Sequence, residues 1–224
     1  MRVLRGRAET VSADREATRA GVERTREDGQ PRVRVWRPHP HVAFGRRDAN
    51  REGYNEARQV AADRGYAVAD RAVGGHAVAL PGTTVTFAAA EPVEESRTGI
   101  QERYDRAAST LAAALAELGV DVEEGEPDGA FCPGTHSLSA TGKIVGLAQR
   151  VRSDVAVVSG VVVVQDHREI ADVLEPVYEA LSIPFDPDAI GSVARAGGET
   201  EPVRDTIERH FAGPDPVVET VREP

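Results

Sequence analysis

The stretch from Gly129 to Arg150 reads GAFCPGTHSLSATGKIVGLAQR, and it decides the expected fold. It begins with a cysteine, proline and glycine turn at 132–134 and ends in an apolar run of strand length. A second turn signal, which finishes on Gly142, separates the two parts. The pattern predicts a β-hairpin whose arms bring Cys132 and Lys143 near one another.

Cys132 and Lys143 are the only cysteine and the only lysine of this 224-residue chain, which otherwise uses arginine for positive charge. A lysine presents a compact charge, and a cation beside a thiol favours the thiolate, which is the nucleophilic form. A lone cysteine is also common as a small buried apolar residue. The residues alone leave both interpretations of Cys132 open.

A second motif precedes this stretch and runs from Arg71 to Leu80 as RAVGGHAVAL. Glycine lacks a Cβ atom, so the pair Gly74 and Gly75 lets the backbone approach a ligand closely. A plain tight turn explains the double glycine almost as well. The small side chains at 77–80 would add apolar surface beside either structure.

Together, these motifs resemble those of the lipoate-protein ligase and octanoyltransferase family. Residues 131–139 and 142–150 are similar to its cysteine and lysine motifs, and residues 71–80 to its arginine and double-glycine motif. The similarity is greatest to the cysteine-dependent branch, which transfers octanoyl or lipoyl groups between proteins. It covers roughly residues 30–185, and both motifs occur in the expected order.

The resemblance implies a fold, an activity and partners. The implied fold is α+β, with a mixed, largely antiparallel β-sheet flanked by helices, as in biotin/lipoate protein ligase catalytic domains. The implied reaction transfers an octanoyl or lipoyl group to the acceptor lysine of a lipoyl carrier domain through a Cys132 thioester. Implied carriers are the glycine cleavage H protein and the acyltransferase subunits of 2-oxoacid dehydrogenases.

The resemblance also assigns site residues. Cys132 would be the nucleophile, and Lys143 would hold the acyl carbonyl and stabilise the oxyanion. His136 or His76 could transfer protons, because imidazole titrates near neutral pH. The residues expected to bind substrate are Arg71, Gly74, Gly75, His76, Ala77, Val78, Gly142 and Gly146. No metal ligands are expected.

Some features depart from the family pattern and leave alternatives. Ser137 stands where the family usually has an aspartate, and Leu80 where ligases commonly have a histidine. The transferase would need no cofactor. An ATP-dependent lipoate ligase would use ATP and Mg²⁺ to form an acyl-adenylate, and Cys132 would then be incidental. Further alternatives are a Cys132/His136 hydrolase and a non-catalytic carrier-binding protein.

Composition excludes several other classes of protein. The formal net charge is −10 and aromatic residues make up 4%, which argues against nucleic-acid binding. Apolar runs are too short for a membrane span, and no secretory signal is evident at the start of the sequence. One cysteine excludes an internal disulfide framework and a cysteine-rich zinc site. We therefore expect a cytoplasmic protein.

The expected organisation is a single domain in three parts. Residues 1–30 form an N-terminal helical arm capped by Ser12, residues 31–185 form the acyl-transfer catalytic domain, and residues 186–224 form a C-terminal helix and a mobile acidic tail. Period-two alternation predicts a strand with one buried face at 32–36. Further strands are expected at 41–45, 66–69, 83–89 and 155–164, and further helices at 48–64, 99–118, 168–182 and 202–211.

Overall fold

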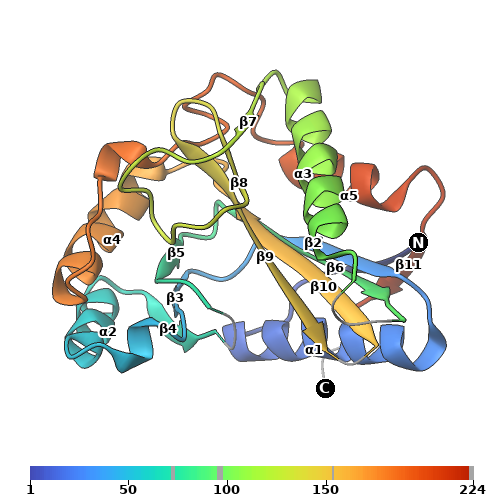
Figure 1. Cartoon of the computed structure of the whole chain (residues 1–224), viewed down its shortest axis with the longest axis horizontal. Helices are drawn as coiled ribbons and strands as arrows, with labels where there is room; N and C mark the ends of the chain where they lie inside the picture. Colours follow the sequence, from blue (N-terminus) through green and yellow to red (C-terminus); the bar gives the residue numbers. More distant parts are fainter. Residues whose placement is uncertain (72–73, 95–97, 153, 222–224) are drawn as a thin grey trace.

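The computed structural model describes residues 1–71, 74–94, 98–152 and 154–221 (Figure 1). Within these residues, eight strands form one sheet in the order β11-β1-β2-β6-β10-β9-β8-β7. Every pairing in it is antiparallel except those of β1 with β2 and with β11. The predicted mixed, largely antiparallel sheet is confirmed. The strands are β1 (Arg2–Arg5), β2 (Arg32–Trp36), β6 (Val85–Pro92), β7 (Glu123–Glu124), β8 (Ser137–Ser139), β9 (Lys143–Arg152), β10 (Val155–Val162) and β11 (Val217–Thr220).

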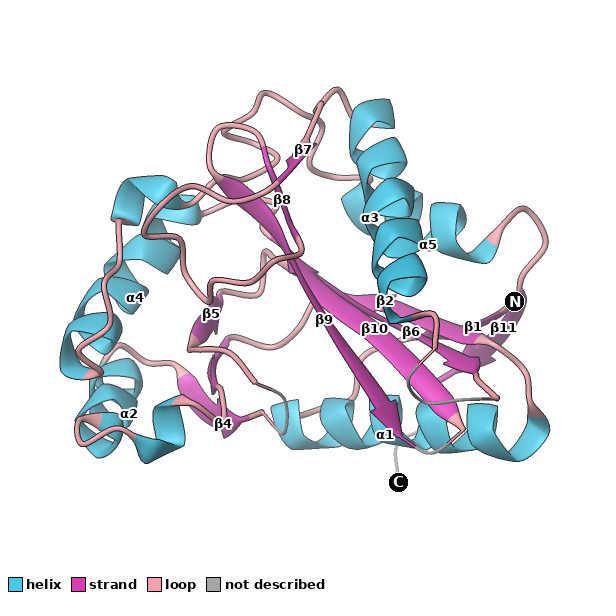
Figure 2. Cartoon of the chain, in the orientation of Figure 1, coloured by secondary structure: helices cyan, strands magenta, loops and turns pink. Residues whose placement is uncertain are grey.

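Helices cover both faces of this sheet (Figure 2). Helix α5 (Val203–Ala212) packs against β2, and helix α3 (Ile100–Glu117) packs against α5 and against strands β8, β9 and β10. Their apolar side chains and the alternate valines of β2 belong to one of two hydrophobic cores. Helix α1 (Val11–Asp28) covers the opposite face, where the intervening arginines of β2 point. The helices expected at 99–118 and 202–211 are thereby confirmed.

A small sheet and two helices build the second core. Strands β3 (His41–Phe44), β4 (Ala67–Asp70) and β5 (Val78–Leu80) form a sheet in the order β4-β3-β5. Helices α2 (Tyr54–Asp63) and α4 (His167–Ala180) pack beside it, and short 3₁₀ turns occupy Asp48–Asn50 and Pro187–Ala189. This core lies next to the β8–β9 hairpin, so the two predicted motifs meet at the junction of the two cores.

The N-terminal part differs from the prediction. Strand β1 precedes the helix, and the helix is capped by Thr10, whose hydroxyl accepts from the Ala13 N–H at 3.1 Å, rather than by Ser12. The prediction that β2 has one buried face was wrong, because both faces are buried: Arg34 lies beneath α1 and pairs with Asp14 at 2.6 Å. A buried arginine needs such a partner, and a strand pattern cannot reveal one that lies on another element.

The C-terminal part also differs. Residues 217–220 belong to the predicted mobile tail, yet they form β11, which runs parallel to β1. Glu219 of β11 contacts Arg2, Arg24 and Arg32. Burial acts to raise the pKa of Glu219, but hydrogen bonds and the charges of these arginines outweigh it and lower that pKa. Both ends of the described chain therefore lie in one sheet, and the division at 30/31 and 185/186 stays a prediction.

Candidate active site

The predicted hairpin is present, and its geometry requires the glycine in its turn. Strand β8 pairs with β9, with Leu138 opposite Val145 and an irregularity just before the turn. Gly142 has φ +135°, and a Cβ atom there would lie 2.6 Å from the backbone nitrogen of Gly191. Only glycine fits such a position without strain. The turn places Lys143 at the start of β9, beside the loop that carries Cys132.

Lys143 is buried and contacts the backbone of that loop. Its Nζ donates to the carbonyl of Cys132 at 3.0 Å, to the carbonyl of Phe131 at 3.1 Å and to Glu126 Oε2 at 2.7 Å. An ammonium has three donors, so these acceptors use all of them. The predicted proximity of Cys132 and Lys143 is confirmed, but the lysine contacts the backbone carbonyl of Cys132 rather than its thiol.

Cys132 has an unusual backbone conformation that is held on both sides. Its φ is +44°, in the left-handed region that non-glycine residues rarely adopt. Its N–H donates to the hydroxyl of Tyr178 at 2.6 Å, and that hydroxyl donates to the carbonyl of Ala77 at 3.0 Å. Burial raises the pKa of the Tyr178 phenol well above its ordinary value, so the hydroxyl stays protonated. Tyr178 thus joins the two sequence motifs.

The sulfur of Cys132 lies against the arginine and double-glycine motif. Arg71 Nη2 is 3.5 Å from Sγ and also donates to the carbonyl of His76. A Cβ atom on Gly75 would lie 2.6 Å from Sγ, whereas one on Gly74 would meet open space. The cation beside the sulfur is therefore Arg71. Gly75 is the glycine that lets the sulfur of Cys132 lie this close to the backbone of the motif. Residues 72–73 of this motif lie outside the described residues.

His76 has a fixed orientation. Its Nδ1 lies 2.8 Å from Oδ1 of Asp48, and Oδ2 of Asp48 accepts from the Gly45 N–H at 2.8 Å. Asp48 is fully buried. An ionised carboxylate only accepts hydrogen bonds, so the network assigns a proton to Nδ1 and, in the neutral ring, leaves Nε2 as an acceptor. Such an imidazole is suited to accept a proton at Nε2.

The remaining predicted residues have separate places. The ring of His136 stacks on Tyr104 of α3, with centroids 3.8 Å apart. Gly146 lies opposite Ser137, and a Cβ atom there would lie 3.5 Å from Cε of Lys143. Ala77 and Val78 are buried in the second core, against which Cys132 also packs. They add apolar surface to the core that Cys132 contacts, and their role in binding an acyl chain stays a prediction.

Three residues of the site were not among those predicted, namely Asp48, Glu126 and Tyr178. Sequence patterns placed Asp48 at a helix start, Glu126 in a polar connection and Tyr178 on a helix. Asp48 and Tyr178 contact motif residues from distant parts of the chain, and Glu126 contacts Lys143 from the loop before the cysteine motif. No local signal in the sequence announces these contacts, because they depend on how the elements pack.

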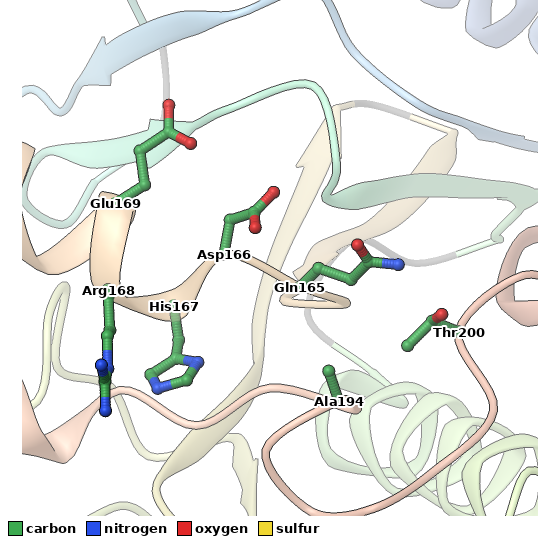
Figure 3. Close-up of a pocket in the computed structure, with 7 residues that line it drawn as sticks. All are labelled: Gln165, Asp166, His167, Arg168, Glu169, Ala194 and Thr200. Carbon is green, nitrogen blue, oxygen red and sulfur yellow. The ribbon is translucent and has the colours of Figure 1, made fainter.

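A separate hollow of about 380 Å³ lies at the N-terminus of α4 (Figure 3). None of its lining residues is a predicted site residue. Burial and two nearby arginines lower the pKa of His167, which lies there. The lining residues are Gln165, Asp166, His167, Arg168, Glu169, Ala194 and Thr200.

Comparison with known proteins defines the class. The chain matches the family model of the lipoyl protein ligase A/B catalytic domain over residues 16–211, so it belongs to that family. It is 35% identical over 127 residues to an octanoyl-[GcvH]:protein N-octanoyltransferase of Geobacillus kaustophilus, covering 56% of this chain and 45% of the relative. It is 32% identical over 130 residues to the protein of that name from Anoxybacillus flavithermus, covering 57% and 46%. The chain spans about half the length of these relatives.

Solved structures share the fold. A lipoate-protein ligase A bound with ATP superposes with a TM-score of 0.76 and 18% identity, covering 99% of this chain and 89% of that one. A putative lipoate protein ligase from T. acidophilum with bound lipoic acid gives 0.73 and 18%, with the same coverage. The described helices include none long and apolar enough to cross a membrane.

Proposed function

We propose that this protein transfers an octanoyl or lipoyl group to the acceptor lysine of a lipoyl carrier domain through a thioester on Cys132. One observation carries the proposal. The chain's single thiol lies on a left-handed backbone that is held on both sides, with an arginine beside its sulfur. The names of the relatives, octanoyl-[GcvH]:protein N-octanoyltransferases, support the same reaction.

The first step forms the thioester. The Cys132 thiolate attacks the acyl carbonyl, a carbon–sulfur bond forms, and the bond from the acyl carbon to its donor breaks. The donor leaves with the bonding electrons and takes a proton, which we assign to Nε2 of His76, the same nitrogen that receives a proton in the second step. The Arg71 guanidinium, whose Nη2 lies 3.5 Å from Sγ, places positive charge beside the attacking sulfur.

The second step transfers the acyl group. The acceptor amine attacks the thioester, a carbon–nitrogen bond forms, the carbon–sulfur bond breaks, and the thiolate returns. We assign the amine proton to Nε2 of His76, because Asp48 holds the opposite side of that ring. His136 is less suited, since its ring stacks on Tyr104.

The acyl chain would lie on the apolar surface beside the thiol. Ala77 and Val78 supply part of that surface, and Gly75 allows the backbone to come close. Burial of eight carbons at about 0.8 kcal/mol each gives on the order of 6 kcal/mol of transfer free energy. Such a gain is enough to select an acyl chain of medium length over a short one.

Lys143 stabilises the loop that carries Cys132 through hydrogen bonds to its carbonyls, and it provides positive charge near the reacting carbonyl. Its three donors are already engaged, so contact with an oxyanion requires one acceptor to be released. An ATP-dependent ligase would need this lysine to contact both a carboxylate and a phosphate. The engagement of Lys143 therefore favours the transferase, which needs neither ATP nor Mg²⁺, over the ligase.

The proposed partners are lipoyl carrier domains. The H protein of glycine cleavage is the first candidate, because the relatives are named for action on GcvH. The acyltransferase subunits of 2-oxoacid dehydrogenases are proposed as further carriers, and the cytoplasm as the place of the reaction.

A transfer assay tests the proposal. Octanoylated H protein is mixed with an unmodified lipoyl domain and the purified chain, without ATP, and both carriers are weighed by intact-mass spectrometry. We expect the octanoyl group to move to the second carrier with the wild type but not with Cys132→Ala. Modification that requires free lipoate and ATP, and that persists in Cys132→Ala, would support the ligase instead.

A further inference from the structure

Glu126 is a hydrogen-bond acceptor for three separate parts of the active-site region. It lies in the connection between β7 and β8 and is largely buried, with its side chain 17% exposed. Oε2 accepts from Lys143 Nζ at 2.7 Å and from Ser137 Oγ at 2.9 Å, and Oε1 accepts from the Gly134 N–H at 2.9 Å. These donors belong to the start of β9, the start of β8 and the loop just after Cys132.

The carboxylate therefore fixes the cysteine loop from two directions. The Gly134 amide that it accepts from lies two residues after Cys132. The ammonium that it binds donates to the carbonyls of Phe131 and Cys132. A residue in the left-handed region persists only where the surroundings over-determine its conformation. Glu126 provides much of that determination at Cys132.

Glu126 also compensates a buried charge. Lys143 is 1% exposed, and Glu126 is the carboxylate that contacts its ammonium. A buried ammonium that loses its counter-charge is strongly unfavourable. Removal of this carboxylate would therefore leave the Lys143 ammonium buried without a counter-charge.

We propose that Glu126 is a positioning residue, which acts through Lys143 and the Gly134 amide to hold Cys132 in its reactive conformation. Its effect on acyl transfer rests on the proposed function. Its effect on the loop itself does not, and the two effects are measured separately.

The test variant is Glu126→Gln. A carboxylate accepts through both oxygens, whereas an amide has one acceptor oxygen and turns an NH₂ group toward at least one of the three donors. Glu124→Gln is the matched control, because Glu124 is an exposed glutamate two residues away on β7. Hydrogen exchange of peptide 129–138 reports the loop, and acylation and alkylation of the single cysteine report its reactivity.

We expect exchange of this peptide to rise roughly tenfold in Glu126→Gln, as the loss of a hydrogen bond to a charged group implies. The kcat of acylation should fall by a similar factor, while alkylation by iodoacetamide changes by less than about threefold, since positioning matters more for acyl transfer than for a small reagent. Glu124→Gln should match the wild type in all three measurements.

Unchanged loop exchange in Glu126→Gln would overturn the proposal, as would equal effects in Glu124→Gln. If Glu126→Gln does not fold, Ser137→Ala provides a milder test, because it removes one donor from the same carboxylate. A smaller rise in exchange of the same peptide is then expected, and no rise refutes the role. Raised loop exchange together with a wild type that transfers no acyl group would support Glu126 and refute the proposed function.

Discussion

Replacement of Tyr178 by phenylalanine tests the link between the two motifs. The change removes one hydroxyl and keeps a ring that is fully buried between α4 and β5. In the wild type this hydroxyl accepts from the Cys132 N–H at 2.6 Å and donates to the Ala77 carbonyl at 3.0 Å. Both partners are backbone groups, so they remain in Tyr178→Phe and lose their hydrogen-bond partner.

The expected magnitude follows from those two backbone groups. A buried donor or acceptor left without a partner costs about 1–3 kcal/mol. The Ala77 carbonyl is buried, whereas the Cys132 amide is only partly buried and can recover some hydration. We therefore expect Tyr178→Phe to lower the free energy of unfolding by about 2–4 kcal/mol. It should also raise hydrogen exchange at Cys132.

Urea unfolding followed by circular dichroism measures the stability, with Tyr66→Phe as the control. The Tyr66 hydroxyl donates to Glu169, an exposed carboxylate that water can solvate instead. Its loss should cost less than about 1 kcal/mol. Because the pKa of Tyr178 is raised well above 10.0, the difference between the variants should not change from pH 6 to pH 9. Equal stability of the two variants, with unchanged exchange at Cys132, would refute the reasoning.

Two further predictions concern the motif and the sheet edge. Gly75→Ala should abolish acylation of Cys132, because Gly75 has φ +87° and a Cβ atom there would lie 2.6 Å from Sγ. Gly74→Ala should retain acylation, because a Cβ atom on Gly74 meets open space. Intact-mass spectrometry measures acylation of both variants, and equal acylation would contradict the assigned geometry. Glu219→Gln should destabilise the protein near neutral pH, because Arg32 and its neighbours lower the pKa of Glu219 in the folded state. The stabilisation by Glu219 is present above its ordinary pKa of 4.5 and is lost as the pH falls through the lowered pKa of the folded state. The difference in unfolding free energy between wild type and Glu219→Gln should therefore shrink below about pH 4.5. Urea titrations at several pH values measure this difference, and a difference that stays constant with pH would contradict the prediction.

The sequence was sufficient for features whose causes are local. The hairpin follows from a turn at Gly142 and an apolar strand beyond it, and α3 follows from its long run of strong helix formers. The fold class was predicted from the resemblance of the motifs to those of a known family. Proximity of Cys132 and Lys143 could be predicted because Cys132 lies on the loop that leads into the hairpin and Lys143 begins the hairpin's second strand.

Features that depend on distant partners could not be predicted. Strands β1 and β11 are each four residues long, and the residues that pair between them are 215 positions apart in the sequence, as for Arg2 and Val217. Parallel pairing of that kind leaves no turn signal between the strands. Tyr178 has the pattern of an ordinary core residue, and its hydroxyl gains a role only when α4 packs beside the cysteine loop.

Ser137 departs from the family pattern, and the structure shows what surrounds it. The family usually has an aspartate at this position, and this chain has no carboxylate there. In the structure a carboxylate contacts Lys143 from Glu126, and Ser137 donates to that same carboxylate. The charge is present, but it comes from another part of the chain.

Formation of the Cys132 thioester is read most simply from the mass of the protein itself after mixing with octanoylated H protein, without ATP. We expect an adduct of one octanoyl group that maps to Cys132, is removed by hydroxylamine and is absent from Cys132→Ala. No adduct on the wild type, together with modification of an unmodified carrier that depends on ATP and lipoate, would contradict this expectation and leave Cys132 as a packing residue.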